Sequence, residues 1–498
     1  MLRNLFMLIL SVLLLVSCQK NPTAASEIRF GIAQAPLNLD PRYATDAASE
    51  RVNRLIYQPL VDFDAASKPA WILARSHAIN DTNYRFTLNK KRALFHYQKI
   101  LTATDVKATY DSFLIDSPFY LKDSPHTAEF ANIAKIIVED EDTVLFQLKQ
   151  PDKHFVEKLI IGILPKDFIE VKHDFSRNPV GNGPLKFVSW QNNLSLQRVS
   201  DGQLITLQEV KDPTVRVLKL RKGEIDLIQG DLPPELVKHL QSMAPNNNLA
   251  IRVHTGLGAN YSYLGLNMQD ALLKNLKVRQ AIAHAIDRQA IIDKVMVSNS
   301  RIAGAILPPE HFAGNSKLTP YDYNPALAKK LLIEAGVKLP LKLEYKTSTD
   351  AFRVRLATIM QAQMALAGIV LEIKSLDWGT FFADVKAGNF QLYGLTWVGI
   401  KTPEIYSKAF GSNYFPPNGF NRGRYADAEL DKLLADENWP AATQRIHAQL
   451  PYIPLWYEGQ FAAMQKNIKN YAPKPDGNWD VLAMIERSAT ITRSATIQ

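Results

Sequence analysis

The pattern of apolar and polar positions predicts strands and helices in mixed order along most of the chain. Alternation of apolar and polar residues, which turns one face of a strand toward a core, occurs at 27–32 and 84–88, and strands are also expected at 143–148 and 185–190. A helical pattern that begins near residue 50 stops before Pro59, because a proline disfavours helical geometry in the residue that precedes it. The chain is therefore expected to combine α and β structure.

Two segments carry the clearest helix signals. Over 278–297 apolar residues recur every three or four positions, which predicts one long amphipathic helix. Over 324–336 the signals are at the ends. Asn324 can cap the helix, Pro325 suits its first position, and Gly336 can adopt the left-handed conformation that ends it.

Helices and strands alternate in the second half of the chain. We expect helices at 352–367 and 378–387, each followed by a strand, at 370–376 and 390–396. This alternation predicts an α/β domain over about 260–470.

The N-terminus predicts export and a lipid anchor. Arg3 precedes an apolar run at 5–16 that is too short to span a bilayer comfortably but suits the core of a signal peptide. The run ends in Leu-Val-Ser-Cys at 15–18, which resembles a bacterial lipobox. We therefore expect Cys18 to be lipidated; a plain signal peptide with an incidental cysteine is the alternative.

Cleavage at the lipobox would remove 1–17 as a lipoprotein signal peptide. The polar stretch 18–26 would then tether the lipid to the folded body. No other segment has 18 or more consecutive apolar residues. The body is thus expected to be anchored to a membrane without crossing it.

Composition narrows the class of protein. The 498 residues, 46% hydrophobic and 21% charged, are typical of a soluble globular protein of roughly three domains. Lys and Arg number 58 against 49 Asp and Glu. This modest excess, without a long basic run, does not indicate a nucleic-acid partner. A single Cys excludes an intrachain disulfide and any metal site built from several cysteines.

The sequence contains none of the catalytic motifs that we searched for. A phosphate-binding GxxxxGK[ST] loop, HExxH and GxSxG are all absent. The ten His include no pair at metal-ligand spacing, and His284 is interpreted as a core or interface residue. We therefore expect no enzymatic activity, no catalytic residue, no metal and no cofactor.

Eight short segments occur in a recognisable order. The most specific is 278–288, Val-Arg-Gln-Ala-Ile-Ala-His-Ala-Ile-Asp-Arg. The others lie at 39–41, 55–60, 101–106, 179–184, 223–226, 328–336 and 452–456. In this order, and behind a lipobox, they make the chain resemble the family 5 bacterial extracellular solute-binding proteins. That family includes the dipeptide and oligopeptide receptors of ABC importers, with nickel-binding and other relatives.

The resemblance implies an α/β, two-lobed periplasmic-binding-protein fold (type II, cluster C) with an extra domain on lobe I. Lobe I would be discontinuous, at 27–57, 180–260 and 470–498. The extra domain would cover 58–179, and lobe II 261–469. The ligand would lie between lobes that close on it by a hinge motion.

The resemblance also implies a set of ligand-binding residues. In the family, the backbone of the strand matching 393–399 contacts the ligand, and Trp397 would line the cleft, although a buried Trp more often belongs to a core. A loop after the first strand would line it as well. The expected ligand-binding residues are Leu37, Asn38, Tyr393, Thr396, Trp397, Val398, Gly399, Ile400 and Lys401.

One position departs from the peptide-binding pattern. In peptide-binding members an Asp follows this strand and pairs with the α-amino group of the ligand, since an unpaired buried ammonium is costly. Here the matching residue is Ile400, followed by Lys401, and the next acid is Glu404. The ligand could accordingly be a blocked or modified peptide, a cell-wall fragment, or an anionic compound that meets Lys401.

The resemblance implies the receptor of an ABC importer that passes a peptide or peptide-like solute to a permease and its ATPase subunits. Such receptors are usually monomers. The protein would be lipid-anchored on the periplasmic or extracytoplasmic face of the cell envelope. Gln19 is not the Asp that resembles an inner-membrane retention signal, so an outer-membrane destination is open. A non-transport sensor or surface-binding lipoprotein, a receptor for a non-peptide solute, and a hydrolase of cell-envelope material are the alternatives.

Overall fold

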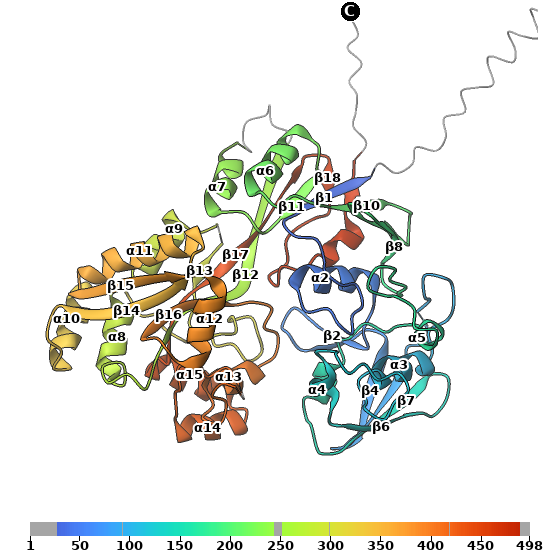
Figure 1. Ribbon diagram of the computed structural model, residues 1–498, viewed down its shortest axis with the longest axis horizontal. Helices are drawn as coiled ribbons and strands as arrows, with labels where there is room; N and C mark the ends of the chain where they lie inside the picture. The colour runs from blue at the N-terminus through green and yellow to red at the C-terminus, as the bar shows by residue number, and fades with distance from the viewer. Residues whose placement is uncertain (1–26, 92, 244–250, 298, 418, 489–498) are drawn as a thin grey trace, which may run out of the picture.

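A computed structural model (Figure 1) provides the structure of the chain. The expected signal peptide 1–17 and the tether 18–26, with Cys18, lie outside the residues that it describes. The described residues are 27–91, 93–243, 251–297, 299–417 and 419–488.

One mixed sheet runs through both halves of the molecule (Figure 1). Its two long central strands are β12 (Ile251–Leu266) and β17 (Tyr452–Gln465), which pair antiparallel. On one side follow β16 (Leu392–Trp397), β14 (Leu341–Ser348) and β15 (Ile369–Leu376), while β13 (Arg301–Ile302) pairs with β17. On the other side follow β11 (Leu227–Gln229), β1 (Ile28–Ile32), β10 (Leu204–Glu209), β9 (Leu194–Arg198) and β8 (Leu185–Trp190).

Lobe II is the part built around the largest apolar core, to which β14, β15, β16 and one half of β12 and of β17 contribute. Tyr263 and Trp456 are fully buried there. Its helices are α8 (Leu276–His284), α9 (Arg288–Lys294), α10 (Pro325–Glu334), α11 (Ala351–Ala365), α12 (Trp378–Ala387), α13 (Glu404–Phe410), α14 (Ala428–Ala435) and α15 (Trp439–Gln449).

Lobe I is the part around a second core, formed by β1, β8, β9, β10 and a C-terminal segment whose Trp479 packs edge-on against Phe30, with 5.0 Å between ring centroids. A small satellite core joins two of its helices to the other ends of β12 and β17. Its remaining elements are α2 (Ala47–Ile56), α6 (Pro213–Lys222), α7 (Pro234–Met243), β18 (Ile468–Lys469), the 3₁₀ helix η2 (Asp480–Met484) and β19 (Glu486–Arg487).

The extra domain has its own core beneath an antiparallel sheet in the order β4-β5-β7-β6. In chain order its elements are β2 (Val61–Phe63), β3 (Pro69–Trp71), β4 (Ala74–Asn80), β5 (Asn83–Leu88), α3 (Ala103–Asp111), α4 (Thr127–Phe130), β6 (Ile133–Val138), β7 (Thr143–Leu148), the 3₁₀ helix η1 (Phe155–Lys158) and α5 (Lys166–Glu170).

β12 and β17 connect the lobes through an irregular stretch of their ladder. The register shifts between Gly256 and Asn260, where β12 carries extra residues. Gly258 lies so close to β17 that an added Cβ would stand 1.6 Å from the carbonyl oxygen of Glu458. On β17, Tyr457 belongs to the core of lobe II and Phe461 to the satellite core of lobe I. β17 therefore passes from one core to the other near Glu458. The lobe boundary expected at 469 stays a prediction.

The helix expected over 278–297 is interrupted, and the expectation of one helix there is wrong. The backbone N–H of Asp287 would donate to the carbonyl of Ala283 in a continuous helix, but it donates instead to Oε1 of Gln363 at 3.0 Å. The guanidinium of Arg288 reaches back and satisfies the Ala283 carbonyl at 3.0 Å. Apolar periodicity continues across such a break and does not reveal it.

The end signals at 324–336 are confirmed. The side chain of Asn324 accepts the N–H of Leu327 at 2.9 Å, Pro325 opens α10, and Gly336 has a φ of 75°. Within the described part of the chain, no helix is long and apolar enough to cross a membrane.

Candidate ligand-binding site

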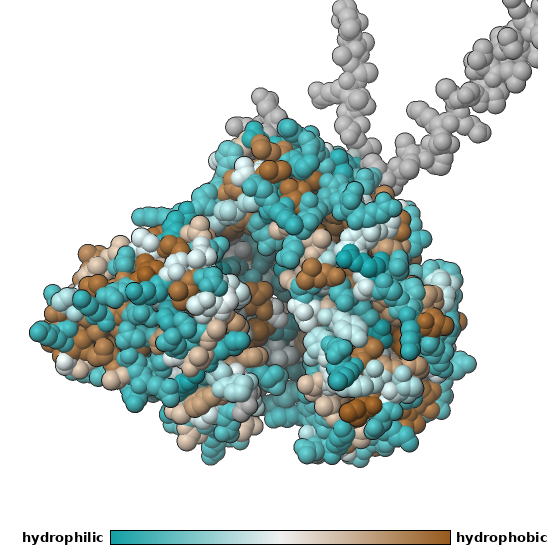
Figure 2. Space-filling model, in the orientation of Figure 1, coloured by the Kyte–Doolittle hydropathy of each residue, from teal (hydrophilic) through white to brown (hydrophobic). Residues whose placement is uncertain are grey.

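A cavity of about 650 Å³ lies between lobe II on one side and lobe I with the extra domain on the other. Figure 2 shows the hollow between the two parts. Segments far apart in sequence line the cavity, among them α2, the region of β2, the stretch 157–162, the loop 399–405 and residues 476–480. A space of this size is typical of small-molecule sites.

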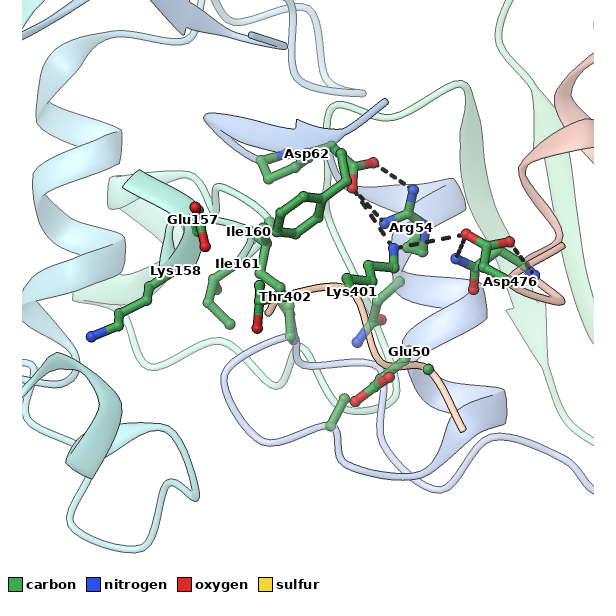
Figure 3. Close-up of a pocket in the computed structure, with 18 of the residues that line it drawn as sticks. Glu50, Arg54, Asp62, Glu157, Lys158, Ile160, Ile161, Lys401, Thr402 and Asp476 are labelled. Atoms are coloured by element: carbon green, nitrogen blue, oxygen red, sulfur yellow. Dashed lines mark hydrogen bonds and ion pairs between the residues drawn. The ribbon is translucent and has the colours of Figure 1, made fainter. Parts of the chain in front are cut away.

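The loop after β16 carries Lys401 across the cavity. Gly399, with a φ of 70°, adopts the left-handed conformation that turns the chain out of the strand. The ammonium Nζ of Lys401 lies 3.9 Å from Asp62 Oδ1 and 3.8 Å from Asp476 Oδ2 (Figure 3). We call this contact the Lys401 bridge. Burial, followed by the nearby Arg54, lowers the pKa of Lys401 below its ordinary value.

Arg54 neutralises the carboxylates behind that bridge. Its guanidinium donates to both oxygens of Asp62, at 3.1 and 2.5 Å, and to Asp480 Oδ1 at 3.1 Å (Figure 3). Burial works against ionisation of Asp62, but the Arg54 hydrogen bonds hold its pKa below the ordinary value. The cluster therefore contains little uncompensated charge.

His311 holds the Lys401 loop from the side of lobe II. The N–H of Ala313 donates to Nδ1 of His311 at 3.0 Å, so Nε2 carries the proton and donates to the carbonyl of Lys401 at 2.8 Å. Burial lowers the pKa of His311, which favours this neutral imidazole. The loop is thus positioned by its backbone as well as by its ammonium.

A second contact joins the extra domain to lobe II. Glu437 accepts from His154 Nε2 at 2.7 Å and pairs with Lys153 Nζ at 2.5 Å. We call this contact the Glu437 bridge. The other ring nitrogen of His154 lies 3.4 Å from Glu157. The Glu157 and Glu437 carboxylates outweigh desolvation and raise the pKa of His154 above its ordinary value.

The structure brings only part of the expected site to this cavity. Gly399, Ile400 and Lys401 line it. Leu37 is 63% exposed and Asn38 is half-buried beside α2; neither lines the cavity. The backbone N–H groups of both donate to Oγ of Ser49, at 2.9 and 3.0 Å, which ties their loop to lobe I.

The residues of β16 are set back from the cavity. The Tyr393 side chain is fully buried in the core of lobe II and does not line the cavity, and the expected ligand contact of its strand stays a prediction. Thr396 hydrogen-bonds Ser262 at 2.7 Å, within a group that includes Glu458. Val398 is exposed but lies outside the cavity.

Trp397 reaches the edge of the cavity through a neighbour. Its ring lies 5.6 Å from that of Phe420, which lines the cavity, and the Arg422 guanidinium lies 4.9 Å from the Trp397 ring. Among the described residues, no group of three His, Cys, Asp or Glu is arranged to hold a metal ion.

Sequence reasoning missed most of the charged lining. Glu50 and Arg54 lie on α2, Asp62 on β2, and Asp476 and Asp480 near the C-terminus. No spacing rule connects residues so distant in the chain. A helix with Glu50 and Arg54 four residues apart suggests an ordinary surface ion pair, not a cavity wall.

A family model described as bacterial extracellular solute-binding proteins, family 5 (middle), matches residues 68–415, more than half of the sequence. The chain belongs to this family. The resemblance inferred from the eight segments is confirmed.

Three similar curated proteins span most of the family 5 chain described here. The oligopeptide-binding protein AppA of Bacillus subtilis is 25% identical, over 91% of this chain and 90% of its own. The glutathione-binding protein GsiB of Salmonella choleraesuis is 26% identical, over 91% and 93%. The heme-binding protein A of Haemophilus influenzae is 26% identical, over 89% of each chain.

A solved structure, that of HbpA2 from Haemophilus parasuis, matches with a TM-score of 0.80 at 22% identity and covers 93% of this chain and all of the other. The likeness shows the fold. The expected α/β, two-lobed periplasmic-binding-protein fold of type II is confirmed for this family member.

Proposed function

We propose that the protein is the substrate-binding receptor of an ABC importer, and that it captures a peptide or peptide-like solute between its lobes. The observation that carries this proposal is the cavity of about 650 Å³ between two lobes joined by two long strands. Family membership and the names of the similar proteins, an oligopeptide-binding and a glutathione-binding protein among them, support it.

Capture would follow from closure of the lobes. A ligand that touches both walls stabilises the closed form by its differential affinity for that form. The loop 399–401 reaches across the cavity and would contact the ligand together with the α2 wall. Apolar residues such as Ile160 and Ile161 on the opposite wall would accept side chains of varied shape.

The lipid anchor forms part of the proposal. Cys18 would carry the lipid, and residues 18–26 would let the monomeric body reach a permease and its ATPase subunits from the extracytoplasmic face. Intact-mass analysis of protein extracted from membranes checks this. A mature chain that begins at a lipidated Cys18 is expected, and an unmodified chain that retains residues 1–17 would refute the anchor.

Native mass spectrometry tests the ligand class. The protein is extracted from its own membranes, and any molecule released on denaturation is identified. A ladder of masses that resolves to oligopeptides or modified peptides is expected. A single non-peptide molecule would contradict the peptide assignment while leaving a solute receptor in place.

Uptake tests the importer role separately. Deletion of the gene is expected to reduce accumulation of the identified solute, and plasmid-borne wild-type protein should restore it. Normal uptake combined with altered signalling or adhesion would instead favour the sensor or surface-binding alternative.

A further inference from the structure

One carboxylate in the cavity lacks a partner. Seven Asp and Glu residues line the cavity. Four of them pair with a Lys or Arg within 4 Å, and Glu129 and Glu157 each lie within 4 Å of a His ring. The exception is Glu50, whose side chain makes no hydrogen bond or ion pair with any residue that the structure describes. Figure 3 shows its carboxylate directed into the space beside the Lys401 loop, without a dashed contact.

The basic residues of the cavity are already engaged. Arg54 is bound by Asp62 and Asp480, and Lys401 by Asp62 and Asp476. Lys408 pairs with Glu404 at 3.0 Å, and Lys158 pairs with Asp152 at 2.6 Å. No Lys or Arg that lines the cavity is therefore left to neutralise Glu50.

Arg54 is positioned in the sequence to pair with Glu50, but in the folded protein it pairs with other residues. Arg54 is four residues along α2, the spacing at which Glu and Arg normally pair on a helix surface. The two aspartates of the Arg54 cluster hold its guanidinium instead. Glu50 is exposed to the open cavity. Partial desolvation by the cavity walls still raises the pKa of its carboxyl above the ordinary value, and nearby His126 and Lys401 offset this only in part.

His126 adds a second unsatisfied group to the same wall. Its Nδ1 lies 3.6 Å from Glu129, but its Nε2 is buried and has no hydrogen-bond partner. The unpartnered nitrogen therefore lies beneath the cavity surface, and the group that this wall presents to the cavity is the unpaired Glu50 carboxylate.

We propose that Glu50 is the counter-ion for a primary ammonium group of the ligand, so that the cavity selects solutes with a free amine. The inference rests on the proposed function, because it assigns a role within that same site. A charge-assisted N–H···O bond to a carboxylate is among the stronger polar contacts in a partly desolvated site. The ligand amine would be the charged partner that Glu50 lacks within the protein.

A structural role for Glu50 makes a different prediction. Glu50 lies in the first turn of α2, where a negative charge stabilises the helix dipole. Loss of that role would lower stability slightly and would affect all ligands alike. Glu404 is a matched control, since it lines the same cavity from the first turn of α13 but is paired with Lys408.

The test measures amine selectivity with a defined probe. A peptic digest of casein is divided, and one half is treated with acetic anhydride to block every primary amine. The halves are mixed in equal amounts and offered to the full-length, detergent-extracted protein. Retained peptides are counted by mass spectrometry for the wild type, Glu50→Gln, Glu50→Asp and Glu404→Gln.

We expect the wild type to favour free-amine peptides by about tenfold, the value of one charged hydrogen bond. Glu50→Gln should reduce that preference to nearly one while still retaining acetylated peptides, which shows that it is folded. Glu50→Asp and Glu404→Gln should keep most of the preference. Equal retention of both halves by the wild type, or an unchanged preference in Glu50→Gln, would overturn the inference alone. Retention of no peptide by the wild type would overturn the proposed function, and the inference with it.

Discussion

The Lys401 bridge and the Glu437 bridge both join lobe II to the opposite side of the cleft, but they are built from different kinds of charged groups. The Lys401 bridge joins lobe II to lobe I from within the cavity, beside the Arg54 cluster, and its side chains are mostly buried. The Glu437 bridge joins lobe II to the extra domain, includes an imidazole, and uses a lysine that is 63% exposed. Charges withdrawn from water interact more strongly and are screened less than exposed ones. The two contacts thus differ in kind: the Lys401 bridge is less exposed but spans 3.8–3.9 Å, whereas the Glu437 bridge is closer, at 2.5–2.7 Å, and more open to solvent.

The difference also extends to pH. Lysine and aspartate ordinarily change charge far from neutrality, whereas histidine changes charge within the physiological range. The Lys401 bridge should therefore act as a fixed contact, and the Glu437 bridge as one that responds to the surroundings of the cell envelope. Four predictions test this contrast, in order of expected effect.

Asp62→Asn should have the largest effect, because Asp62 serves both Arg54 and Lys401. Removing its charge leaves two partly buried cations with one carboxylate fewer, and we expect a loss of about 2 kcal/mol in the free energy of unfolding. Urea denaturation measures this loss. Glu334→Gln, which removes a more exposed pair with Lys277, is the control, with an expected loss below about 0.5 kcal/mol. Equal losses of unfolding free energy in the two variants would show that Asp62 contributes no more to stability than an exposed ion pair does.

Lys401→Met should shift the protein toward an open form. It removes the cross-lobe ammonium but leaves Arg54 on Asp62, so stability should change little while the closed form loses about 1 kcal/mol, or roughly fivefold in population. Small-angle scattering of the ligand-free protein should report a larger radius of gyration. Lys374→Met on exposed β15 should leave it unchanged. An unaltered radius in Lys401→Met would show that the bridge does not hold the lobes.

The Glu437 bridge should weaken as pH rises. The pKa of His154 is raised in this structure, so the protonated form favours the contact. The contribution is complete below the ordinary value of 6.5 and is lost as pH passes upward through the raised pKa. Scattering should accordingly detect opening between about pH 6 and pH 8. Glu157 remains beside His154, so Glu437→Gln should diminish the pH response of the radius without altering stability greatly. An identical pH profile in that variant would contradict the prediction.

Lys153→Met should have the smallest effect. Lys153 is the exposed partner in the Glu437 bridge, and a solvent-screened pair of this kind contributes less than about 0.5 kcal/mol. We expect the radius of gyration and its pH dependence to match the wild type within error. A pronounced opening would mean that Lys153, and not His154, carries the contact.

The sequence predicts the elements with local signals and misses those that depend on distant partners. The caps of α10 lie where Asn324 and Gly336 indicate, because capping is decided within four residues. The break after α8 depends on Gln363 and on the Arg288 side chain. No sequence pattern within 278–297 predicts these two contacts.

The candidate site divides in the same way. The family resemblance led to Gly399, Ile400 and Lys401, which line the cavity, but it gave no hint of Asp62, Glu50 or the C-terminal aspartates. From the sequence, Lys401 would be free to meet an anionic ligand. In the structure it is engaged by two carboxylates from the opposite wall, so its charge is already balanced. Which charged side chains pair, and which stay unpaired, depends on the folded structure.

The paired strands β12 and β17 carry a consequence for how the molecule can be divided. Each half of the molecule takes its central sheet positions from opposite ends of the same two strands, and Gly258 leaves no room for a side chain where they pass. Lobe I takes its strands from both sides of lobe II in the sequence, so no continuous fragment that omits lobe II encodes it, and a cut in a surface loop of lobe II leaves the halves joined through the other strand. The protein is therefore a single mechanical unit, in which a change at the crossing affects both lobes.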